Sequence, residues 1–378
     1  MPVVRGDRNL RIIITGGGTG GHVYPALAIA RGLQEVRPDV EIQYIGTSRG
    51  LEADVVPRAG LNFKTVTVKG LERRKFWRNI PALAKLSKGF IEAWFLVRRF
   101  NPDIVVGSGG YVCAPVCFAA ALQGIPVVLH EQNAVPGITN RLLSNLARLV
   151  CLTFEEAANH FSRRAKLITT GLPVRPEILN ADRETNRERL GLNKNQLFIV
   201  VVGGSQGAKS INQAMLPILN EMKTRNDISV LHVTGRRDYE AYLDKVQALG
   251  IDLAEHGNIT IKPYVYDMEN ALAAADLVIG RAGASFLAEI LARGLPSILI
   301  PYPYAAANHQ EFNARAVAKK GAALLVLDRE LKAGRLYKSL LELLDDKKRL
   351  KSMGMAASKL GRPDALSIIV EKILSEAK

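Results

Sequence analysis

A glycine-rich turn that ends in a histidine is the first feature of the sequence that could do chemistry. The stretch GGGTGGH at residues 16–22 follows the apolar run Ile12-Ile13-Ile14, which predicts a strand, a tight turn and the first turn of a helix. There the positive end of the helix dipole disfavours an imidazolium, so His22 stays neutral and can accept a proton. A histidine that only hydrogen-bonds the loop backbone would suit the same place, and the residue types alone favour neither interpretation.

Two common nucleotide-binding motifs must be weighed against this turn. Gly16, Gly18 and Gly21 formally satisfy the G-x-G-x-x-G fingerprint of dinucleotide oxidoreductases. That fingerprint also needs a carboxylate near the end of the second strand, and the strand expected there ends Tyr44-Ile45-Gly46-Thr47 without one. The sequence therefore disfavours an NAD enzyme, and because it has no G-x-x-x-x-G-K-[ST] stretch it also disfavours a P-loop NTPase.

Two more glycine turns follow apolar runs, Gly109-Gly110-Tyr111 and GGSQG at 203–207. Glycines let backbone amides and a helix N-terminus approach an anionic group closely. Tight strand-to-helix turns can need glycine without any ligand, but this explains one such loop more easily than three. Polar residues also follow other strands, where parallel sheets bind ligands: His130-Glu131-Gln132-Asn133, Glu289 and His309-Gln310.

Metal ions and cofactors are not expected to take part. The chain has no D-x-D motif and no His/carboxylate cluster with metal-ligand spacing, so we expect the charge of a diphosphate to be met by amides, helix N-termini and Arg175. The cysteines, Cys113, Cys117 and Cys151, show no zinc spacing either, and we expect them to be buried in a reducing compartment. The N-terminus lacks the apolar core and cleavage site of a signal peptide, so export is not expected.

These residues need a scaffold in which short strands alternate with helices. Runs such as RIIIT, EIQYIG, DIVVG and LFIVVVGG, each followed by a turn and a helical pattern, predict an α/β fold with parallel sheets. The pattern starts at residues 12–22 and again at 198–214, so we expect two Rossmann-like domains facing across a ligand-binding cleft. We place the N-terminal domain at 1–173, the C-terminal domain at 174–355, and a helix that packs back on the N-terminal domain at 356–378. The uncharged stretch 104–129 is broken by glycines and prolines, which disfavours a transmembrane helix.

Basic residues concentrate in one segment of the chain. The formal net charge is +15, and between Lys64 and Arg99 ten Lys/Arg residues accompany only two glutamates. This favours an anionic partner, although nothing else resembles a nucleic-acid-binding module, and no nucleic acid is expected. Apolar residues spaced three to four apart over 80–90 predict an amphipathic helix, and we expect residues 91–97 to pack against the N-terminal domain. The cationic and aromatic residues just before it are Arg73, Arg74, Lys75, Phe76 and Trp77.

An ordered set of motifs, from about Arg11 to Leu327, resembles the MurG family of glycosyltransferases. They read GGGTGGHVYPALAIA, VVGSGGYVCAPV, IPVVLHEQNAVPGITNRLL, GLPVR, VVVGGSQGAKSIN, DMENALAAADLVIGRAGAS and NHQEFNA. The resemblance implies the GT-B fold and an inverting transfer of N-acetylglucosamine from UDP-N-acetylglucosamine to undecaprenyl-diphospho-muramoyl-pentapeptide in peptidoglycan synthesis. It implies acceptor binding mainly in the N-terminal domain and UDP binding in the C-terminal one.

The resemblance also assigns site residues, motif by motif. His22 becomes the candidate base, or the residue that orients the acceptor, and the loops for the acceptor diphosphate are Gly17, Gly18, Gly109, Gly110 and Tyr111. The residues implied for the donor are Thr19, Gly20, Gly21, Asn133, Arg175, Ser205, Val265, Ala284, Ser285, Phe286, Leu287, Ala288, Glu289 and Gln310. Among these, Val265 is expected at the uracil, Glu289 at the ribose and Gln310 at the hexose. The family usually has Thr at position 286 and commonly Asp at position 307, where this chain has Phe286 and Ala307, so a side-chain hydroxyl contact at 286 is not expected.

An undecaprenyl acceptor stays in the bilayer, so the resemblance implies peripheral attachment to the cytoplasmic face of the bacterial cell membrane. We expect residues 73–77 to meet its anionic surface, where each basic residue contributes about 1 kcal/mol. Other proteins of cell-wall synthesis are further candidate partners. Two alternatives remain: another GT-B enzyme with a lipid acceptor, and a non-catalytic protein that binds nucleotide sugars or polyanions.

Overall fold

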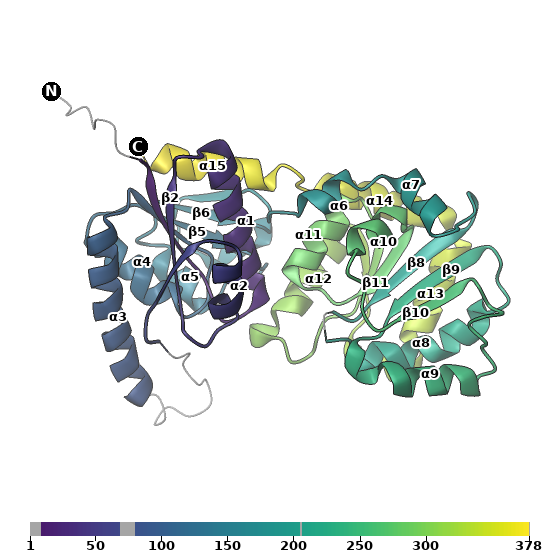
Figure 1. Ribbon diagram of the computed structural model, residues 1–378. Helices are drawn as coiled ribbons and strands as arrows, with labels where there is room; N and C mark the ends of the chain where they lie inside the picture. The colour runs from purple at the N-terminus through teal and green to yellow at the C-terminus, as the bar shows by residue number, and fades with distance from the viewer. Residues whose placement is uncertain (1–8, 69–79, 205, 378) are drawn as a thin grey trace. The chain divides into compact units, whose positions relative to one another are not determined.

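The computed structural model describes residues 9–68, 80–204 and 206–377. The chain divides into two compact units, one formed by Met1–Pro173 with Asp364–Lys378 and the other by Val174–Pro363, and each is described by itself (Figure 1). The predicted membrane-facing residues 73–77 and the predicted donor residue Ser205 lie outside the described residues.

The first unit is built on a seven-stranded parallel sheet with the order β3-β2-β1-β4-β5-β6-β7. Its strands are β1 (Arg11–Thr15), β2 (Glu41–Gly46), β3 (Asn62–Thr65), β4 (Ile104–Gly107), β5 (Val127–Glu131), β6 (Leu149–Leu152) and β7 (Leu167–Thr169). Its helices are α1 (Gly20–Val36), α2 (Glu52–Arg58), α3 (Ile80–Phe100), α4 (Cys113–Leu122), α5 (Ile138–Leu143), the 3-10 helix η2 (Glu155–His160) and α15 (Ala365–Glu376).

Both faces of this sheet are buried, as its continuous apolar strands require. Ile12 and Ile14 of β1 join one core cluster with α1 and α15, while Ile13 joins another with α3, α4 and α5. Alternate side chains of one strand therefore serve opposite layers, which is the pattern of a parallel sheet covered by helices. The three cysteines are buried in this unit, as predicted.

The second unit repeats this plan with a six-stranded parallel sheet in the order β10-β9-β8-β11-β12-β13. Its strands are β8 (Leu197–Val202), β9 (Ile228–Val233), β10 (Ile259–Lys262), β11 (Leu277–Gly280), β12 (Ser297–Leu299) and β13 (Ala323–Leu325). Its helices are α6 (Pro176–Asn180), α7 (Arg183–Arg189), α8 (Lys209–Met222), η3 (Arg236–Asp238), α9 (Tyr239–Ala248), α10 (Met268–Ala274), α11 (Ala284–Ala292), η4 (Ala306–Asn308), α12 (His309–Lys319), η5 (Asp328–Ala333), α13 (Arg335–Asp345) and α14 (Lys347–Leu360). Two parallel Rossmann-like sheets confirm the predicted fold class.

The end of the chain forms two helices where the sequence suggested one. α14 ends at Leu360 in the second unit, and α15 begins at Ala365 in the first, beyond Pro363. α15 packs so closely on α1 that a Cβ on Gly32 would lie 2.9 Å from Leu366 Cδ1.

In both sheets the first strand of the unit is the point where the strand order reverses. β1 lies between β2 and β4, and β8 lies between β9 and β11. Ligands of open α/β sheets bind beyond the carboxyl ends of the strands at such a point. All the glycine turns singled out in the sequence follow β1, β4 or β8, so they lie at these two places.

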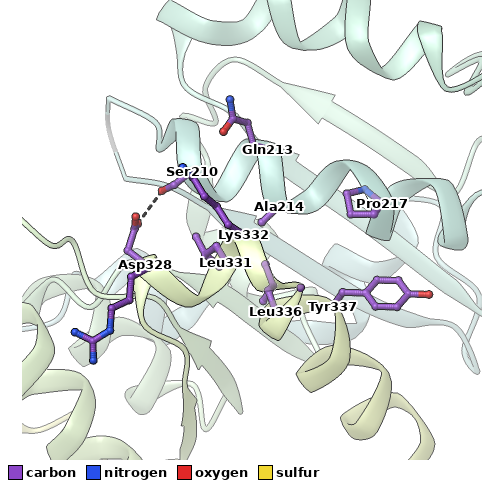
Figure 2. A pocket seen from close by; sticks show the side chains of 11 residues that line it. Ser210, Gln213, Ala214, Pro217, Asp328, Leu331, Lys332, Leu336 and Tyr337 are labelled. Carbon is purple, nitrogen blue, oxygen red and sulfur yellow. Dashed lines mark hydrogen bonds between the residues drawn. The ribbon is translucent and has the colours of Figure 1, made fainter.

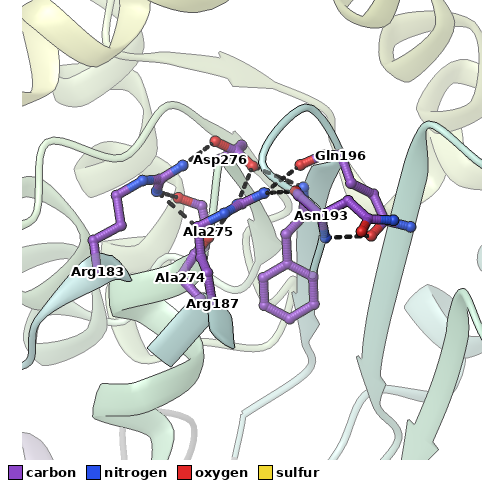
Figure 3. A network of polar contacts seen from close by, with 8 residues as sticks. Arg183, Arg187, Asn193, Gln196, Ala274, Ala275 and Asp276 are labelled. Atoms are coloured by element: carbon purple, nitrogen blue, oxygen red, sulfur yellow. Dashed lines mark hydrogen bonds and ion pairs between the residues drawn. The ribbon is translucent and has the colours of Figure 1, made fainter. Parts of the chain in front are cut away.

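The opposite, amino end of the second sheet is fixed by an ion-pair network (Figure 3). Asp276, just before β11, accepts hydrogen bonds from Arg187 Nη1 at 3.0 Å and from Phe198 N at 2.8 Å, and it pairs with Arg183. The side chain of Arg187 is only 6% exposed, and it also donates to the carbonyls of Asn193 and Gln196. Because the buried guanidinium pairs with Asp276 and both of its Nη atoms donate to carbonyl or carboxylate oxygens, it joins α7 to the starts of two strands without leaving an unpaired charge.

α3 departs from the sequence-based expectation. Ala93 and Val97 are buried, and Trp94 packs against the same core, but Ile91 and Phe95 are 55% and 65% exposed. The prediction that residues 91–97 pack against the domain is therefore wrong for these two side chains, which lie one helical turn apart on the outer face. Among the described residues, no helix has both the length and the apolar character needed to cross a membrane.

Candidate active site

Two glycine turns of the first unit pack against each other. Gly17 N donates a hydrogen bond to Gly109 O at 3.4 Å, and a Cβ on Gly110 would lie 2.3 Å from Gly17 O. A Cβ on Gly16 would collide with the Ser108 side chain, with Oγ 1.9 Å away. These glycines are therefore required by contacts within the unit, whether or not a ligand binds. The interpretation that a ligand alone keeps this turn bare is incomplete.

The outer part of the first turn is more open. Gly18 has a φ of +86°, and a Cβ there would lie 3.1 Å from the Tyr111 ring. At Gly21 the only atom near the Cβ position is Thr19 Oγ1, 3.8 Å away. Gly18, Thr19 and Gly21 are exposed, so the first amides of α1 can meet an anion here.

Glu52 holds this turn through its buried carboxylate, and no pattern in the sequence pointed to it. Its carboxylate is completely buried and accepts hydrogen bonds from Gly18 N at 3.1 Å, Thr47 N at 3.1 Å and Thr47 Oγ1 at 2.7 Å. The dinucleotide fingerprint places its carboxylate near the end of the second strand, whereas Glu52 is the first acidic residue beyond that end. This carboxylate faces the chain's own amides, so it orients the glycine turn.

His22 lies in the first turn of α1, as predicted, with its ring turned toward the second glycine loop. Its Nδ1 lies 3.0 Å from Ser108 O and 2.9 Å from Gln132 Oε1. Burial lowers the pKa of His22, and the hydrogen bonds to Gln132 and Ser108 only partly oppose this. No residue in the described part of the chain hydrogen-bonds Nε2. A neutral imidazole with one unoccupied nitrogen is what a proton acceptor needs.

The polar run after β5 divides into residues that serve the fold and residues beside His22. The buried carboxylate of Glu131 accepts from Asn133 N at 2.9 Å, Gly137 N at 3.2 Å and Asn140 Nδ2 at 2.9 Å, which shapes the loop before α5. Burial raises the pKa of Glu131, and these donors oppose the shift. His130 is also buried, and its Nε2 bonds Gly171 O at 3.0 Å.

In the second unit, two helix N-termini lie at the carboxyl ends of adjacent strands. α8 follows β8, and α11 follows β11 and begins at Ala284. Leu287 N already donates to Gly283 O at 2.9 Å, and Leu287 itself is buried, so of the predicted segment 284–289 the first three amides can best reach a ligand. The turn before α8 is tight, because a Cβ on Gly207 would lie 2.0 Å from Thr234 O.

A partly buried polar bridge joins these two helix N-termini, and Figure 2 shows its Ser210–Asp328 half. Asp328 Oδ2 accepts hydrogen bonds from Ser210 Oγ at 2.7 Å and from Arg281 Nη1 at 2.6 Å. Ser210 belongs to the first turn of α8, and Arg281 stands in the turn before α11. The adjoining pocket of about 360 Å³ lies between α8, η5 and α13 and contains none of the predicted site residues. The sequence analysis did not select this bridge, and no motif points to Asp328.

Arg175 and Glu289, both predicted at the donor site, form an ion pair. Arg175 Nε lies 2.9 Å from Glu289 Oε1, and Nη1 lies 3.9 Å from Glu269 Oε2. Burial raises the pKa of Glu289, while the charge of Arg175 opposes this shift. The structure therefore brings a guanidinium and a carboxylate that were both predicted at the donor site into direct contact.

Val265 lies in the loop after β10, between two aromatic residues that the sequence analysis missed. The rings of Tyr264 and Tyr266 meet edge to face with centroids 4.8 Å apart, and the Arg236 guanidinium lies 5.4 Å from the Tyr264 ring. In the described part of the chain, the peptide groups of Val265 make no hydrogen bond. The signal was the PYVY sequence at 263–266, whose aromatic side chains flank the predicted contact.

The loop before α12 places Gln310 and contains an unusual backbone. Gln310 Oε1 accepts a hydrogen bond from Tyr302 N at 2.9 Å, which leaves its amide N–H groups for a ligand. Ala307 and Asn308 have φ values of 52° and 55°, in the left-handed region. Phe286, the other departure from the family pattern, lies with its ring 3.0 Å from the Cβ position of Gly280, so it covers the end of β11.

The predicted residues thus gather into two half-sites, one at the switch point of each sheet. The first unit brings His22 together with the turns at 16–21 and 108–111, and the second brings Arg175, Glu289 and the start of α11 together. The assigned roles of these residues stay predictions. Among the described residues, no three His, Cys, Asp or Glu side chains are grouped as a metal site would require.

The chain matches glycosyltransferase family 28 in both units. Residues 12–151 match the family's N-terminal domain, and residues 198–368 match its C-terminal domain. A curated relative from Moorella thermoacetica, a UDP-N-acetylglucosamine–N-acetylmuramyl-(pentapeptide) pyrophosphoryl-undecaprenol N-acetylglucosamine transferase, is 70% identical over 97% of this chain and 98% of its own length. The protein of the same name from Desulforamulus reducens is 52% identical over 97% of this chain and 99% of its own length.

Solved structures agree with this assignment. The crystal structure of Acinetobacter baumannii MurG is 32% identical, with a TM-score of 0.79 over 97% of this chain and 99% of that one. A UDP-GlcNAc 2-epimerase from Neisseria meningitidis shares the fold alone, at 16% identity and a TM-score of 0.64 over 97% of this chain and 100% of that one. On these similarities the chain belongs to the MurG family, within glycosyltransferase family 28.

Proposed function

We propose that this protein transfers N-acetylglucosamine from UDP-N-acetylglucosamine to the muramoyl-pentapeptide undecaprenyl diphosphate lipid, with inversion at the anomeric carbon. The observation that carries the proposal is the 70% identity to a transferase of that name over 97% of the chain. The two half-sites support it, because one offers a proton acceptor and the other offers groups that match a nucleoside diphosphate.

In the first unit, His22 serves as the base. Its Nε2 takes the proton of the acceptor's sugar hydroxyl, whose oxygen attacks the anomeric carbon of the donor. The bond from that carbon to the UDP oxygen breaks, and its electron pair leaves with the diphosphate. The exposed part of the turn, Gly18 to Gly21, meets the acceptor diphosphate and the sugar through backbone amides.

In the second unit, the donor diphosphate is held without a metal ion. The first amides of α11 and the guanidinium of Arg175 face the charge that develops as UDP leaves. Glu289 accepts a hydrogen bond from the ribose, and because it pairs with Arg175 at 2.9 Å, the nucleotide must share or displace this ion pair. The peptide groups of Val265 meet the uracil, Gln310 meets the hexose, and Asn133 of the first unit lies near the sugar.

The test is a transfer assay with radiolabelled UDP-N-acetylglucosamine and the muramoyl lipid, in parallel with and without excess EDTA. We expect a labelled disaccharide lipid and released UDP in both arms. Binding of the nucleotide sugar without release of UDP would favour the non-catalytic alternative. Transfer to a different lipid acceptor, and none to this one, would favour another GT-B enzyme. Loss of activity in EDTA that magnesium restores would overturn the metal-independent part.

We also propose peripheral attachment to the anionic, cytoplasmic face of the cell membrane. Exposed apolar side chains on two packed helices support it: Ile91 and Phe95 on α3, and Phe118 and Leu122 on α4, all at least 42% exposed. Lys88, Arg98 and Arg99 on α3 supply positive charge beside them. Exposed apolar side chains together with basic residues on the same helix suit an anionic bilayer surface.

Co-sedimentation with anionic liposomes tests this attachment. Replacing Ile91 and Phe95 by Ser should weaken binding, while a matched double change to exposed apolar residues of the second unit, Leu190→Ser with Leu249→Ser, should not. A further variant with Glu at 73–75 and Ser at 77 tests the basic segment. Unchanged sedimentation of both membrane variants at low salt would overturn the assignment.

A further inference from the structure

We propose that Gln132 and His130 are positioning residues that fix the tautomer of His22, so that Nδ1 carries the hydrogen and Nε2 is the atom that accepts the proton. The inference rests on the proposed function only in naming His22 as the base. The tautomer itself follows from the hydrogen bonds within the first unit.

The orientation of the Gln132 amide is set by its neighbours. Its Nε2 lies 2.8 Å from Ser108 O, 3.1 Å from His130 O and 3.0 Å from His130 Nδ1. Two of these partners are carbonyl oxygens, which can only accept, so the atom that faces them must be the NH2 group. The flipped amide would place its oxygen against both carbonyls. The oxygen of Gln132 therefore faces His22.

This orientation determines which nitrogen of His22 is protonated. Nδ1 lies 2.9 Å from Gln132 Oε1 and 3.0 Å from Ser108 O. Both partners are acceptors, so Nδ1 must carry a hydrogen and share it between them. In a neutral imidazole the other nitrogen, Nε2, is then the unprotonated one.

His130 anchors the network from the opposite side with the opposite tautomer. Its Nε2 lies 3.0 Å from Gly171 O, which makes Nε2 the donor and leaves Nδ1 to accept from Gln132. Burial lowers the pKa of His130 to about 4, so the ring is neutral at physiological pH and Nδ1 can accept. A protonated His130 would point an N–H at the amide N–H of Gln132 and would break the network.

The network also supports the transfer step. When Nε2 of His22 takes the hydroxyl proton, the new imidazolium keeps donating from Nδ1 to Gln132 Oε1 and Ser108 O. In serine proteases a buried carboxylate orients the catalytic histidine in this way, and here a neutral amide does it. A neutral partner stabilises the imidazolium less than a carboxylate does, which suits a base that must release its proton again.

The first test is 15N NMR of protein labelled only at histidine, and the chain contains six histidines. Ring nitrogen shifts report the tautomer directly, and a His22→Gln variant assigns the His22 signals. We expect Nδ1–H for His22 and Nε2–H for His130. His232 provides an internal reference for Nε2–H, because its Nε2 lies 3.1 Å from Asn212 Oδ1. An Nε2–H tautomer at His22 would overturn the inference, whatever the enzymatic activity.

The second test is Gln132→Met, which keeps the side-chain volume but removes the amide. We expect kcat to fall about 10-fold or more, with KM for UDP-N-acetylglucosamine within about twofold. The groups that face the ring are Ser108, Gly109, Gln132 and, behind the amide, His130. Because the Gln132 hydrogen bond raises the pKa of His22, its loss should move the acid limb of the kcat profile to lower pH. A loss of kcat with no shift of that limb would indicate a structural role only.

Two further variants separate positioning from packing. Gln123→Met is the matched control, because Gln123 also donates an amide hydrogen bond to a carbonyl, Trp94 O at 3.3 Å, but outside the network. At position 130, His130→Asn offers an acceptor near the place of Nδ1 and should retain more activity than His130→Leu. Equal losses in both His130 variants would contradict the network. Full activity of His22→Gln would refute His22 as the base while the NMR result stands, so the two failures are distinguishable.

Discussion

The two units share one fold but prepare their switch points in opposite ways. In the first unit the polar side chains are buried and bonded to neutral partners: Glu52 and Glu131 accept mostly from backbone amides, and His22 bonds an amide and a carbonyl. In the second unit the site has a partly exposed ion pair, Arg175 with Glu289, beside unoccupied helix amides. In the proposed function, the first half-site holds one proton acceptor in place and the second receives a charged ligand.

This difference follows from the chemistry of each half. A base needs a fixed ring and a low pKa, which burial and neutral hydrogen bonds supply. A nucleoside diphosphate needs positive electrostatic potential, which a guanidinium and helix N-termini supply. Unlike a base, such a site does not depend on which atom carries a proton. The same strand-turn-helix element therefore serves both tasks, and the side chains around it decide which.

His22→Ala is the variant with the largest expected effect, and it tests whether the first half-site supplies the base. We expect turnover to fall by about 100-fold or more, because general-base assistance typically contributes about 10²–10⁴-fold. UDP binding and the melting temperature should change little, since the ring serves the first half-site alone. His256→Ala, at a partly exposed ring in the second unit whose Nδ1 lies 2.8 Å from Asp252 O, is the control. Near-normal turnover of the His22 variant would mean that the ring only holds the loop.

Glu289→Ala tests the charged half-site. A hydrogen bond between a carboxylate and the ribose typically contributes about 1.5–3 kcal/mol, and the variant should lose much of it in UDP affinity measured by calorimetry. The loss of the Arg175 pair in the free protein offsets part of the effect, because Arg175 is then released for the diphosphate. Gln310→Ala should leave UDP affinity unchanged and relax the choice of sugar donor. Unaltered UDP affinity in the Glu289 variant would refute its place at the ribose.

Acid should destabilise both units, because each contains a fully buried histidine. Burial lowers the pKa of His130 in the first unit to about 4 and that of His232 in the second to about 3. The histidine pKa of an unfolded chain is near 6.5. Between pH 6.5 and the lowered pKa of the folded protein, the unfolded chain therefore binds more protons than the folded protein does. The stabilisation from each neutral histidine is complete above about pH 6.5 and is lost as the pH falls. We expect a loss of about 2 kcal/mol per histidine between pH 7 and pH 5. Urea unfolding at both pH values measures it, and His232→Phe should remove the contribution of the second unit. Stability that stays constant from pH 7 to pH 5 would contradict the predicted burial of both rings.

The fold could be predicted from the sequence because apolar strands and glycine turns leave a local signal. The strands at Ile104–Gly107 and Leu197–Val202 are buried runs with a turn directly behind them. Long-range polar contacts leave no such signal. Glu52 reaches back to Gly18 across 34 residues, and Asp328 reaches Ser210 across 118, so neither could be selected from its neighbours in the chain.

Side-chain direction on a helix was the other point where sequence reasoning failed. The run from 91 to 97 is mostly apolar, which suggested a buried stretch, but a helix turns by about 100° per residue and can bury only one side of it. Ile91 and Phe95 consequently lie on the exposed face while Ala93 and Val97 are buried. The sequence could indicate the helix but not how far the core extends around it.

The smallest expected effect concerns the backbone that presents Gln310 in the second half-site. Ala307 has φ 52° and ψ 23°, a left-handed conformation that costs an L-residue with a Cβ about 1–2 kcal/mol. Asn and Asp tolerate this region better, so the Asp that the resemblance leads us to expect at this position would fit the backbone. We expect Ala307→Asn to raise the free energy of unfolding by about 0.5–1 kcal/mol, since it relieves strain without adding freedom to the unfolded chain.

Ala307→Gly sharpens this prediction. Glycine removes the same strain but makes the unfolded chain more flexible, so its gain should be smaller than that of Asn. Ala318→Gly is the matched control, because Ala318 lies inside α12, where the change should destabilise by about 1 kcal/mol. If Ala307→Gly destabilised the protein as much as Ala318→Gly does, residue 307 would not be left-handed in solution. The loop that leads into α12 and Gln310 would then adopt another conformation in solution.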